Sequence, residues 1–272
     1  MKNSFKIAIC QMQVLDNKDQ NLDKAVSMIN EAANNGAELI VLPEMFNCPY
    51  DTKKFVEYAE TREDSRSLNI ISSASSDNDI YIVAGSIPEL LDGKLYNSSF
   101  TFDRKGEIIG VHRKVHLFDV KIENGIEFKE SDTLNPGNNV TTIETDLIKM
   151  GVAICYDVRF PELFRLMVLD GAEIIIVPGA FNMITGPAHW KTTVRARAID
   201  NQCYLAAASP SRNEDLSYVA YGHSLVVDPW GRVVANAGYS EEIIYAHINK
   251  ELIYKVRKEL PLLENRRTDI YD

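Results

Sequence analysis

The stretch KMGVAICYDVRFPELFRL, residues Lys149–Leu166, decides the expected fold of the chain's second half. Within it, the apolar run Val152–Cys155 indicates a buried strand. Pro161 then begins a helical pattern whose apolar positions are Leu163, Leu166, Met167 and Leu169. Cys155 is therefore expected at a strand-to-helix turn, where free backbone N–H groups lower the pKa of a thiol and can hold an oxyanion. The alternative interpretation is a buried structural cysteine.

The bulk composition limits the class of protein. The chain has 272 residues, of which 45% are hydrophobic, and it lacks a linker rich in Gly, Ser or Pro, so one domain over residues 1–272 is expected. A formal net charge of -10 argues against a nucleic-acid surface. No apolar run approaches the ~20 residues of a membrane helix. The N-terminal MKNSFKIAICQMQV lacks the apolar core of a signal peptide, so a cytoplasmic protein is expected.

The cysteines suggest reduced thiols. They are Cys10, Cys48, Cys155 and Cys203. Because they are widely spaced and form no CxxC pair, neither a disulfide framework nor a zinc ribbon is indicated. We expect no metal and no cofactor.

Hydrophobic periodicity predicts alternating strands and helices. Expected strands cover 5–14, 38–42, 79–87, 94–103, 107–112, 203–209 and 243–248, with a hairpin over 224–234 that turns at 229–231. Expected helices cover a segment from Asn17 or Asp19 to Gly36, then 68–74, 188–201, and a stretch from Asn249 that ends before Pro261. Residues 116–138 are expected to form a long loop, and loops of such length are usually functional or disordered.

One sequence unit occurs twice. GAELIVLPEMF (36–46) recurs as GAEIIIVPGAF (171–181), and each copy follows an amphipathic helix. The echo indicates pseudo-symmetric halves in which Glu44 and Gly179 take equivalent positions. Because antiparallel hairpins are mixed with strand–helix–strand units, the pattern favours an α/β fold, a four-layer α-β-β-α sandwich with mixed sheets.

Three residues that follow apolar strands could act together. Glu44 follows the first copy of the unit, Lys114 follows the strand at 107–112, and Cys155 ends the strand described above. A thiol nucleophile needs a base for its proton and a donor for the developing oxyanion, which a carboxylate and an ammonium can supply. Taken singly, Glu44 and Lys114 could equally be solvated charges at strand ends.

The motifs around these residues carry a family resemblance. LPEMF, HRKVHLFD and CYDVRFPEL resemble, in order and separation, the motifs that bear the Glu, Lys and Cys of the nitrilase superfamily of carbon–nitrogen hydrolases. The likeness continues through PGAFNMITGPAHW, RARAIDNQCYLAAASPSR, YGHSLVVDPWGRV and a tail with paired arginines, which look most like the omega-amidase branch. The resemblance implies a sandwich that forms homodimers, with the C-terminal tail and the helix after Cys155 as interface pieces.

The resemblance also implies a mechanism. Cys155 attacks an amide carbon, Glu44 takes its proton, and Lys114 with the backbone N–H of Tyr156 holds the oxyanion. A thioester forms and is then hydrolysed. Glu130, in EFKESDTLNPG, fits a second active-site glutamate that orients Lys114 and the substrate amide.

The assignment of the second glutamate stays open at this point. Glu123 and Glu127 lie close to Glu130 in the sequence and are alternatives for the second glutamate.

Substrate contacts follow from the same resemblance. Positions matching Arg159, Phe181 and Thr185 contact the acid end of a 2-oxo dicarboxylate monoamide, 2-oxoglutaramate or 2-oxosuccinamate. A guanidinium can hold a carboxylate in two-point geometry, which supports this role for Arg159. The alternative for Arg159 is a pair with Glu162 or Asp157 at the helix start.

Other functions are weighed against this one. Within the family they are deaminated glutathione amidase, N-carbamoyl amide hydrolysis and nitrile hydrolysis. A papain-like pair could use His112, His116, His189 or His223, but none has the sequence context that would orient it. His112 and His116 could suggest a metal, although the HExxH pattern is absent. An interaction protein with a vestigial site is the non-enzymatic alternative.

Overall fold

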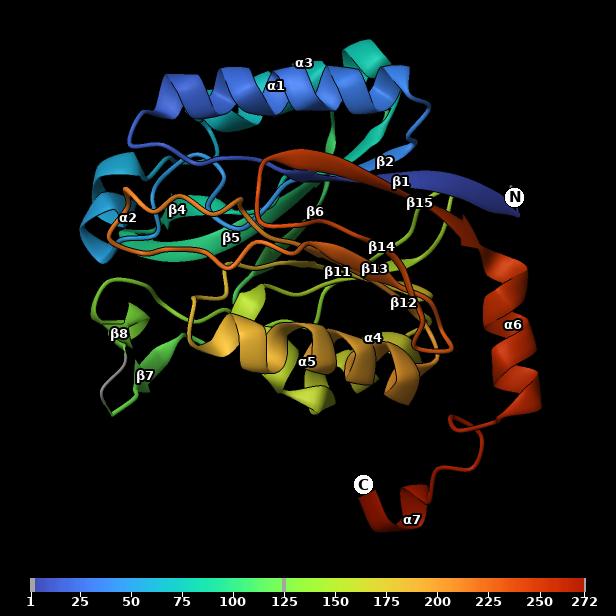
Figure 1. Ribbon diagram of the computed structural model, residues 1–272. Helices are drawn as coiled ribbons and strands as arrows, with labels where there is room; N and C mark the ends of the chain where they lie inside the picture. The colour runs from blue at the N-terminus through green and yellow to red at the C-terminus, as the bar shows by residue number, and fades with distance from the viewer. Residues whose placement is uncertain (1–2, 124–125, 272) are drawn as a thin grey trace.

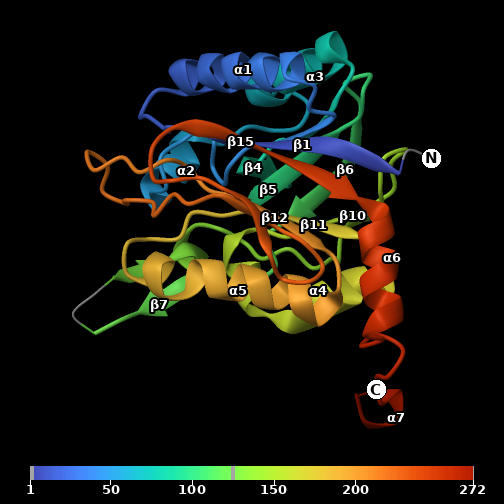
Figure 2. The same ribbon diagram turned by 45° about the vertical axis from the view of Figure 1, so that its right-hand side comes forward.

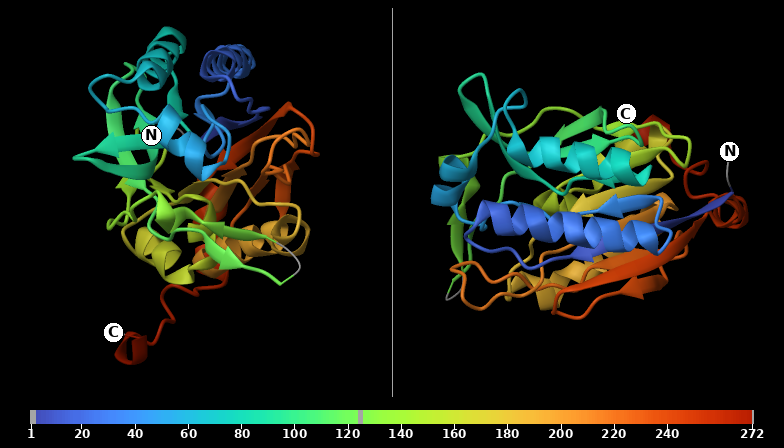
Figure 3. Two further views of the ribbon diagram at one scale, coloured as in Figure 1. Left: turned by 90° about the vertical axis from the view of Figure 1, so that its left-hand side faces the viewer. Right: turned by 90° about the horizontal axis from the view of Figure 1, so that it is seen from above.

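Two β-sheets lie face to face between two layers of helices (Figure 1). The computed structural model describes residues 3–123 and 126–271. Helices α1 (Lys18–Asn34) and α3 (Arg66–Asn78) cover the outer face of one sheet, and α4 (Pro161–Leu169) and α5 (Thr185–Asn201) cover the other. Seen end-on and from above, α1 and α3 run side by side across their sheet (Figure 3). The predicted α-β-β-α sandwich is confirmed.

The strands form two large mixed sheets and one small hairpin. The first sheet holds β15 (Glu242–Asn249), β1 (Ser4–Gln11), β2 (Leu39–Val41), β3 (Tyr81–Val83), β5 (Lys94–Phe102), β4 (Ile87–Leu91) and β6 (Ile108–Arg113). The second holds β14 (Val233–Asn236), β13 (Leu225–Val227), β12 (Tyr204–Ala208), β11 (Ile174–Pro178), β10 (Met150–Val152) and β9 (Thr142–Ile143). Strands β7 (Asp119–Lys121) and β8 (Glu127–Lys129) form the hairpin.

The two sheets repeat one topology. Strands β1, β2 and β3 are parallel neighbours, and so are β10, β11 and β12. Each trio continues into two antiparallel strands, β5 and β6 in the first sheet and β13 and β14 in the second. The echoed sequence units occupy β2 and β11, the central strand of each trio. The predicted pseudo-symmetric halves are therefore present.

Side-chain alternation along the strands divides the core into layers. In β1, Ile7 and Ile9 point into the space between the sheets, whereas Ala8 and Cys10 pack under the helices. The same division holds in β11, where Ile176 faces the other sheet and Ile175 faces α4 and α5. A strand buried on both faces needs apolar residues at every position, which is why β2 and β11 are continuous apolar runs.

One expected strand is wrong. The prediction of a strand over 79–87 fails because the chain turns at Gly85, which has φ 40°. A Cβ atom there would lie 1.9 Å from the carbonyl oxygen of Pro43, so only glycine fits. The segment forms β3 and β4 instead, and both pair with β5.

Several expected boundaries also change. Residues 116–138 are not a plain loop, because they contain β7, β8 and the 3-10 helix η1 (Glu130–Asp132). Helix α2 (Thr52–Tyr58) and strand β9 were not expected, and α5 begins at Thr185 rather than Ala188. Helix α1 starts where expected, because the side chain of Asn17 accepts a hydrogen bond from the Gln20 amide.

The C-terminal segment leaves the sandwich at one edge. Helix α6 (Lys250–Glu259) continues from β15 along that edge (Figure 2), and Asn249, where a helix was expected to begin, is its N-cap. Helix α7 (Thr268–Tyr271) lies away from the two sheets, and its residues are exposed. In the described ranges, every helix is too short or too polar to span a bilayer.

Candidate active site

Cys155 lies at a strained turn between the sheet and a helix. Strand β10 ends at Val152, and the 3-10 helix η2 (Cys155–Arg159) follows after two residues. Cys155 has φ 46°, a left-handed conformation that is rare for a residue with a side chain. Gly179 lies against it, since a Cβ atom on Gly179 would come within 3.2 Å of the Cys155 Cα. A side chain at this position of the second copy would press on Cys155 and on the Trp190 ring, where the first copy carries Glu44.

The surroundings of Cys155 favour the protonated form of its thiol. Burial raises the pKa of Cys155 well above its ordinary value, and the negative charge of Glu44 raises it further. Lys114 and the Ala180 amide lower the pKa of the thiol, but their effect is smaller. The expectation that the turn lowers this pKa is thus wrong, because burial outweighs the backbone donors. The Glu44 carboxylate lies beside the thiol and raises its pKa.

Glu44 connects the two halves of the molecule. Its side chain is fully buried, and Oε1 accepts hydrogen bonds from Lys114 Nζ at 3.0 Å and Asn97 Nδ2 at 2.8 Å. Its Oε2 accepts from the Ala180 amide at 2.8 Å, in the second copy of the repeated unit. Burial raises the pKa of Glu44, and Lys114 only partly offsets this while Glu130 raises it further. A carboxylate with a raised pKa can accept and return a proton near neutral pH.

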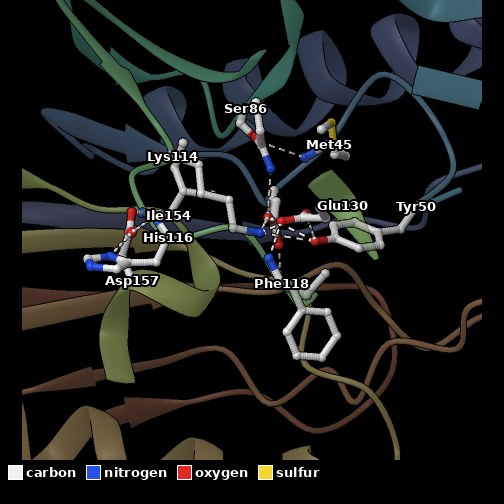
Figure 4. A network of polar contacts seen from close by, with 12 residues as sticks. Met45, Tyr50, Ser86, Lys114, His116, Phe118, Glu130, Ile154 and Asp157 are labelled. Carbon is white, nitrogen blue, oxygen red and sulfur yellow. Dashed lines mark hydrogen bonds and ion pairs between the residues drawn. The ribbon is translucent and has the colours of Figure 1, made fainter. Parts of the chain in front are cut away.

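Lys114 lies between two carboxylates (Figure 4). Its Nζ is 2.8 Å from Glu130 Oε1, 3.0 Å from Glu44 Oε1 and 3.1 Å from Tyr50 Oη. Burial by itself would lower the pKa of Lys114, but Glu130 and Glu44 raise it above its ordinary value, so the ammonium is charged. Tyr50 donates a short hydrogen bond to Glu130, and the Phe118 amide donates to the other oxygen of Glu130 at 2.6 Å.

The structure distinguishes the three candidate second glutamates. Glu130 is fully buried against Lys114. Glu127 is exposed and pairs with Lys121 at 3.0 Å, and Glu123 is also exposed. Only Glu130, among these three, can act on the ammonium of Lys114.

The predicted substrate contacts share one small cavity with the thiol. Arg159, Phe181 and Thr185 line it together with Cys155. The Arg159 guanidinium lies 4.7 Å from the centre of the Phe181 ring, and its Nη1 is 3.1 Å from His189 Nδ1. Among the described residues, neither Glu162 nor Asp157 forms an ion pair with Arg159. The part of the chain that the structure describes therefore offers no carboxylate that neutralises the charge of Arg159.

The backbone near Cys155 offers a further donor. Within residues 3–123 and 126–271, no main-chain carbonyl accepts from the Tyr156 N–H, whereas the next amide, of Asp157, bonds to Ile154. This is the donor expected to help Lys114 with an oxyanion.

The histidines make other contacts. His112 and His116 both hydrogen-bond to Asp157, His189 contacts Arg159, and His223 contacts the Ala237 carbonyl. Glu44, not a histidine, is the ionisable group that raises the pKa of the thiol. Where the chain is described, no group of three or more His, Cys, Asp or Glu side chains is arranged to hold a metal ion.

Sequence reasoning missed three members of the site. They are Tyr50, Asn97 and Tyr218. Tyr218 packs on the Tyr50 ring at 4.6 Å and donates to the Ala180 carbonyl at 2.5 Å. Tyr50 follows Pro49 directly before the Asp51 cap of α2, so recognising that helix start was the signal that could have placed it. Asn97 and Tyr218 had no such signal.

Comparison with known proteins agrees with this geometry. The carbon-nitrogen hydrolase family matches residues 6–258. "Omega-amidase NIT2" of Danio rerio is 46% identical over 269 residues, covering 99% of this chain and 97% of the relative, and the protein of the same name from Mus musculus is 45% identical with the same coverage. The crystal structure of Saccharomyces cerevisiae Nit3, a member of branch 10 of the nitrilase superfamily, has a TM-score of 0.91 and 44% identity and covers 98% of both chains.

Proposed function

This chain belongs to the carbon–nitrogen hydrolase family, within the nitrilase superfamily, and we propose from that premise that it is an omega-amidase. It hydrolyses the terminal amide of a small 2-oxo dicarboxylate monoamide, 2-oxoglutaramate or 2-oxosuccinamate, to the dicarboxylate and ammonia. One observation carries the proposal: the buried Glu44 carboxylate is next to both the Cys155 thiol, whose pKa it raises, and the ammonium of Lys114.

Acylation uses the three groups in sequence. The Cys155 sulfur forms a bond to the amide carbon while Glu44 takes the thiol proton. Negative charge develops on the amide oxygen, where Lys114 and the Tyr156 N–H stabilise it. Glu44 then gives its proton to the amide nitrogen, the carbon–nitrogen bond breaks, and ammonia leaves. A thioester on Cys155 remains.

In deacylation, Glu44 transfers a proton from water to the Cys155 sulfur. Water attacks the thioester carbon while Glu44 takes one of its protons, and the same two donors hold the second oxyanion. When the carbon–sulfur bond breaks, Glu44 returns the proton to Cys155 and the carboxylate product leaves. Glu130 keeps Lys114 charged and oriented through its 2.8 Å contact, which Tyr50 supports from the other side. Because these groups are in contact, their protons titrate as a set rather than one by one.

Selection of the substrate rests on Arg159. The free carboxylate of a monoamide can form a two-point contact with the guanidinium, which has no ion-pair partner among the described residues. Phe181 supports the guanidinium from one face, at 4.7 Å from its ring centre. Thr185 offers a hydroxyl in the same cavity.

A substrate panel tests the proposal. Rates of ammonia or amine release are compared as kcat/KM for 2-oxoglutaramate, 2-oxosuccinamate, deaminated glutathione, an N-carbamoyl amino acid and a simple nitrile. We expect the two monoamides to give the highest values. A higher value for deaminated glutathione would make the protein the amidase for that compound, and no release from any of them would favour the non-enzymatic interaction protein.

A homodimer is part of the proposal. Leu166 and Leu169 belong to the apolar positions of α4, yet their side chains are 51% and 48% exposed. Ile199 of α5 is 39% exposed. Apolar side chains gathered on one helix layer suit contact with a second copy of the chain. Sedimentation analysis at micromolar concentration should show a dimer, and a monomer alone would contradict this part of the proposal.

The four cysteines support the proposed cytoplasmic location. All of them are buried free thiols, which suits a reducing compartment.

A further inference from the structure

We propose that Asp157 is a positioning residue that holds the Cys155 turn and the Lys114 segment at a fixed separation. The inference rests on the proposed function, because it concerns the distance between the nucleophile and the cation that stabilises the oxyanion. Asp157 itself does not line the cavity beside Cys155, whose lining residues include Tyr156 and Arg159 on either side of it.

The carboxylate of Asp157 receives hydrogen bonds from both segments. Its Oδ2 accepts from the Ile154 amide at 2.9 Å and from His112 Nε2 at 3.1 Å. Its Oδ1 accepts from the amide of His116 at 2.9 Å and from the ring Nδ1 of the same residue at 2.8 Å. Asp157 is fully buried, so these contacts are shielded from water.

These partners flank the catalytic groups. Ile154 directly precedes Cys155, and His112 and His116 lie two residues before and two residues after Lys114. Strand β6, which ends at Arg113, belongs to the first sheet, whereas β10 and the Cys155 turn belong to the second. One carboxylate therefore joins the two sheets at the point where their catalytic residues meet, and Figure 4 shows Asp157, His116 and Ile154 together beside the Lys114 backbone.

The imidazole rings are themselves fixed. His116 stacks on Phe160, with ring centroids 3.6 Å apart and planes 7° from parallel. His112 Nδ1 lies 2.9 Å from Thr141 Oγ1, so both nitrogens of this buried ring have partners. When each ring donates one N–H to Asp157, rotation of either ring would break a contact that the surrounding structure cannot replace.

Position matters here because Cys155 is held in an unfavourable backbone conformation, φ 46°, that its neighbours must maintain. A misplacement of about 1 Å between reacting groups can cost about a hundredfold in rate. The hydrogen bonds from both histidines and the Ile154 amide hold the pKa of Asp157 below its usual range although burial opposes this, so the carboxylate keeps its charge at working pH.

Asp228 provides a matched control. It is also buried, and its Oδ1 accepts from the amides of Trp230 and Arg232 at 2.9 Å each, while its Oδ2 accepts from Arg232 Nε at 2.7 Å. It lies in the turn between β13 and β14, which contributes no residue to the cavity beside Cys155. Asp228→Asn and Asp157→Asn each replace a buried acceptor by an amide that cannot accept at both positions.

The experiment measures three properties of both variants. They are the unfolding temperature, kcat/KM for 2-oxoglutaramate and for a neutral amide of similar length, and the rate of Cys155 alkylation by iodoacetamide. We expect both variants to unfold at lower temperature. Asp157→Asn should lose at least about thirtyfold in kcat/KM on both amides alike, while Asp228→Asn keeps activity within about twofold. Alkylation, which needs no oxyanion donor, should change less than about threefold in Asp157→Asn.

Conservative substitutions of the two histidines provide a second test, which perturbs the Asp157 contacts less. His112→Gln keeps a donor near Nε2 and should retain most activity, whereas His112→Leu should not. If Asp157→Asn fails to fold, this pair and His116→Asn against His116→Ala decide the question. Equal losses in Asp157→Asn and Asp228→Asn, or equal activity within each histidine pair, would overturn the inference. A wild-type protein that releases no ammonia from any amide would instead refute the proposed function.

Discussion

Glu44 and Asp157 are both buried carboxylates near Cys155, yet their pKa values move in opposite directions. Burial raises the pKa of Glu44. The ammonium of Lys114 lowers this pKa only in part, and Lys114 also contacts the second carboxylate, Glu130. For Asp157 the same burial is outweighed by donors from two rings and the Ile154 amide, and within residues 3–123 and 126–271 these donors bond to no other carboxylate. Burial alone thus does not fix the role of an acid. The donors that converge on it decide whether it exchanges protons or holds structure.

The largest expected effect comes from removing the Cys155 thiol, from which Glu44 takes a proton. Cys155→Ala should lower turnover by at least about a thousandfold, because the covalent step is lost, while the unfolding temperature stays close to that of the wild type. Ammonia release measures the first effect and calorimetry the second. Cys203→Ala is the matched control, since Cys203 is another fully buried free thiol and lies in the layer under α4 and α5. Activity of Cys155→Ala at a tenth of the wild-type rate would rule out this nucleophile.

Glu44→Gln and Lys114→Met should each lower kcat by about a hundredfold or more, the typical loss for a general base or an oxyanion donor. Lys250→Met, at a buried lysine of α6, should leave kcat unchanged. Mass spectrometry after mixing with substrate adds a second measurement, because Glu44→Gln slows hydrolysis of the thioester. An acyl adduct on Cys10, Cys48 or Cys203 instead of Cys155 would contradict the mechanism.

Arg159→Met tests selectivity rather than chemistry. Loss of a charge-assisted contact costs roughly 2 kcal/mol or more, so kcat/KM for 2-oxoglutaramate should fall at least about thirtyfold. A neutral amide of similar length should be affected little, in contrast to the uniform loss expected for Asp157→Asn. Arg159→Lys should recover only part of the activity, because an ammonium lacks the two-point geometry. Equal losses for the acidic and neutral amides would make Arg159 a structural residue of the turn.

The smallest effects concern stability and pH, and they separate the two carboxylates directly. A raised native pKa means that the folded protein binds the Glu44 proton more tightly, so stability falls as pH rises above the ordinary value of 4.5. Glu44→Gln lacks this pH dependence. The unfolding temperature of the variant should therefore rise relative to that of the wild type as the pH increases from 5 to 8.

Asp157 has the opposite linkage. Its lowered native pKa contributes stability that is complete above the ordinary value of 3.8 and is lost as pH falls below it. The destabilisation in Asp157→Asn should therefore be constant from pH 5 to pH 8 and shrink in more acidic solution. Scanning calorimetry of both variants across pH measures the difference, and parallel curves for the two would show that the two acids do not differ in this way.

Local pattern predicted what depends on neighbours in the chain. The apolar run at 39–42 predicts a strand buried on both faces, and Asn17 is a residue type that caps helices, as it does for α1. The strand expected over 79–87 failed because the approach of Pro43 to Gly85 is a contact between distant segments. Glu130 could not be told from Glu127 for the same reason, since only packing buries one and exposes the other.

The sequence by itself determined the layered α/β architecture, the repeated unit and the family resemblance, whose motifs contain Glu44, Lys114 and Cys155. Periodicity and turn chemistry are encoded within a few residues, so they can be read along the chain. The tertiary structure alone decided that burial raises the pKa of the Cys155 thiol, that Tyr50 contacts Lys114, and that Asp157 bonds to both sides of the site. Each of these depends on desolvation and on donors brought together from separate segments, and neither quantity is a property of local sequence.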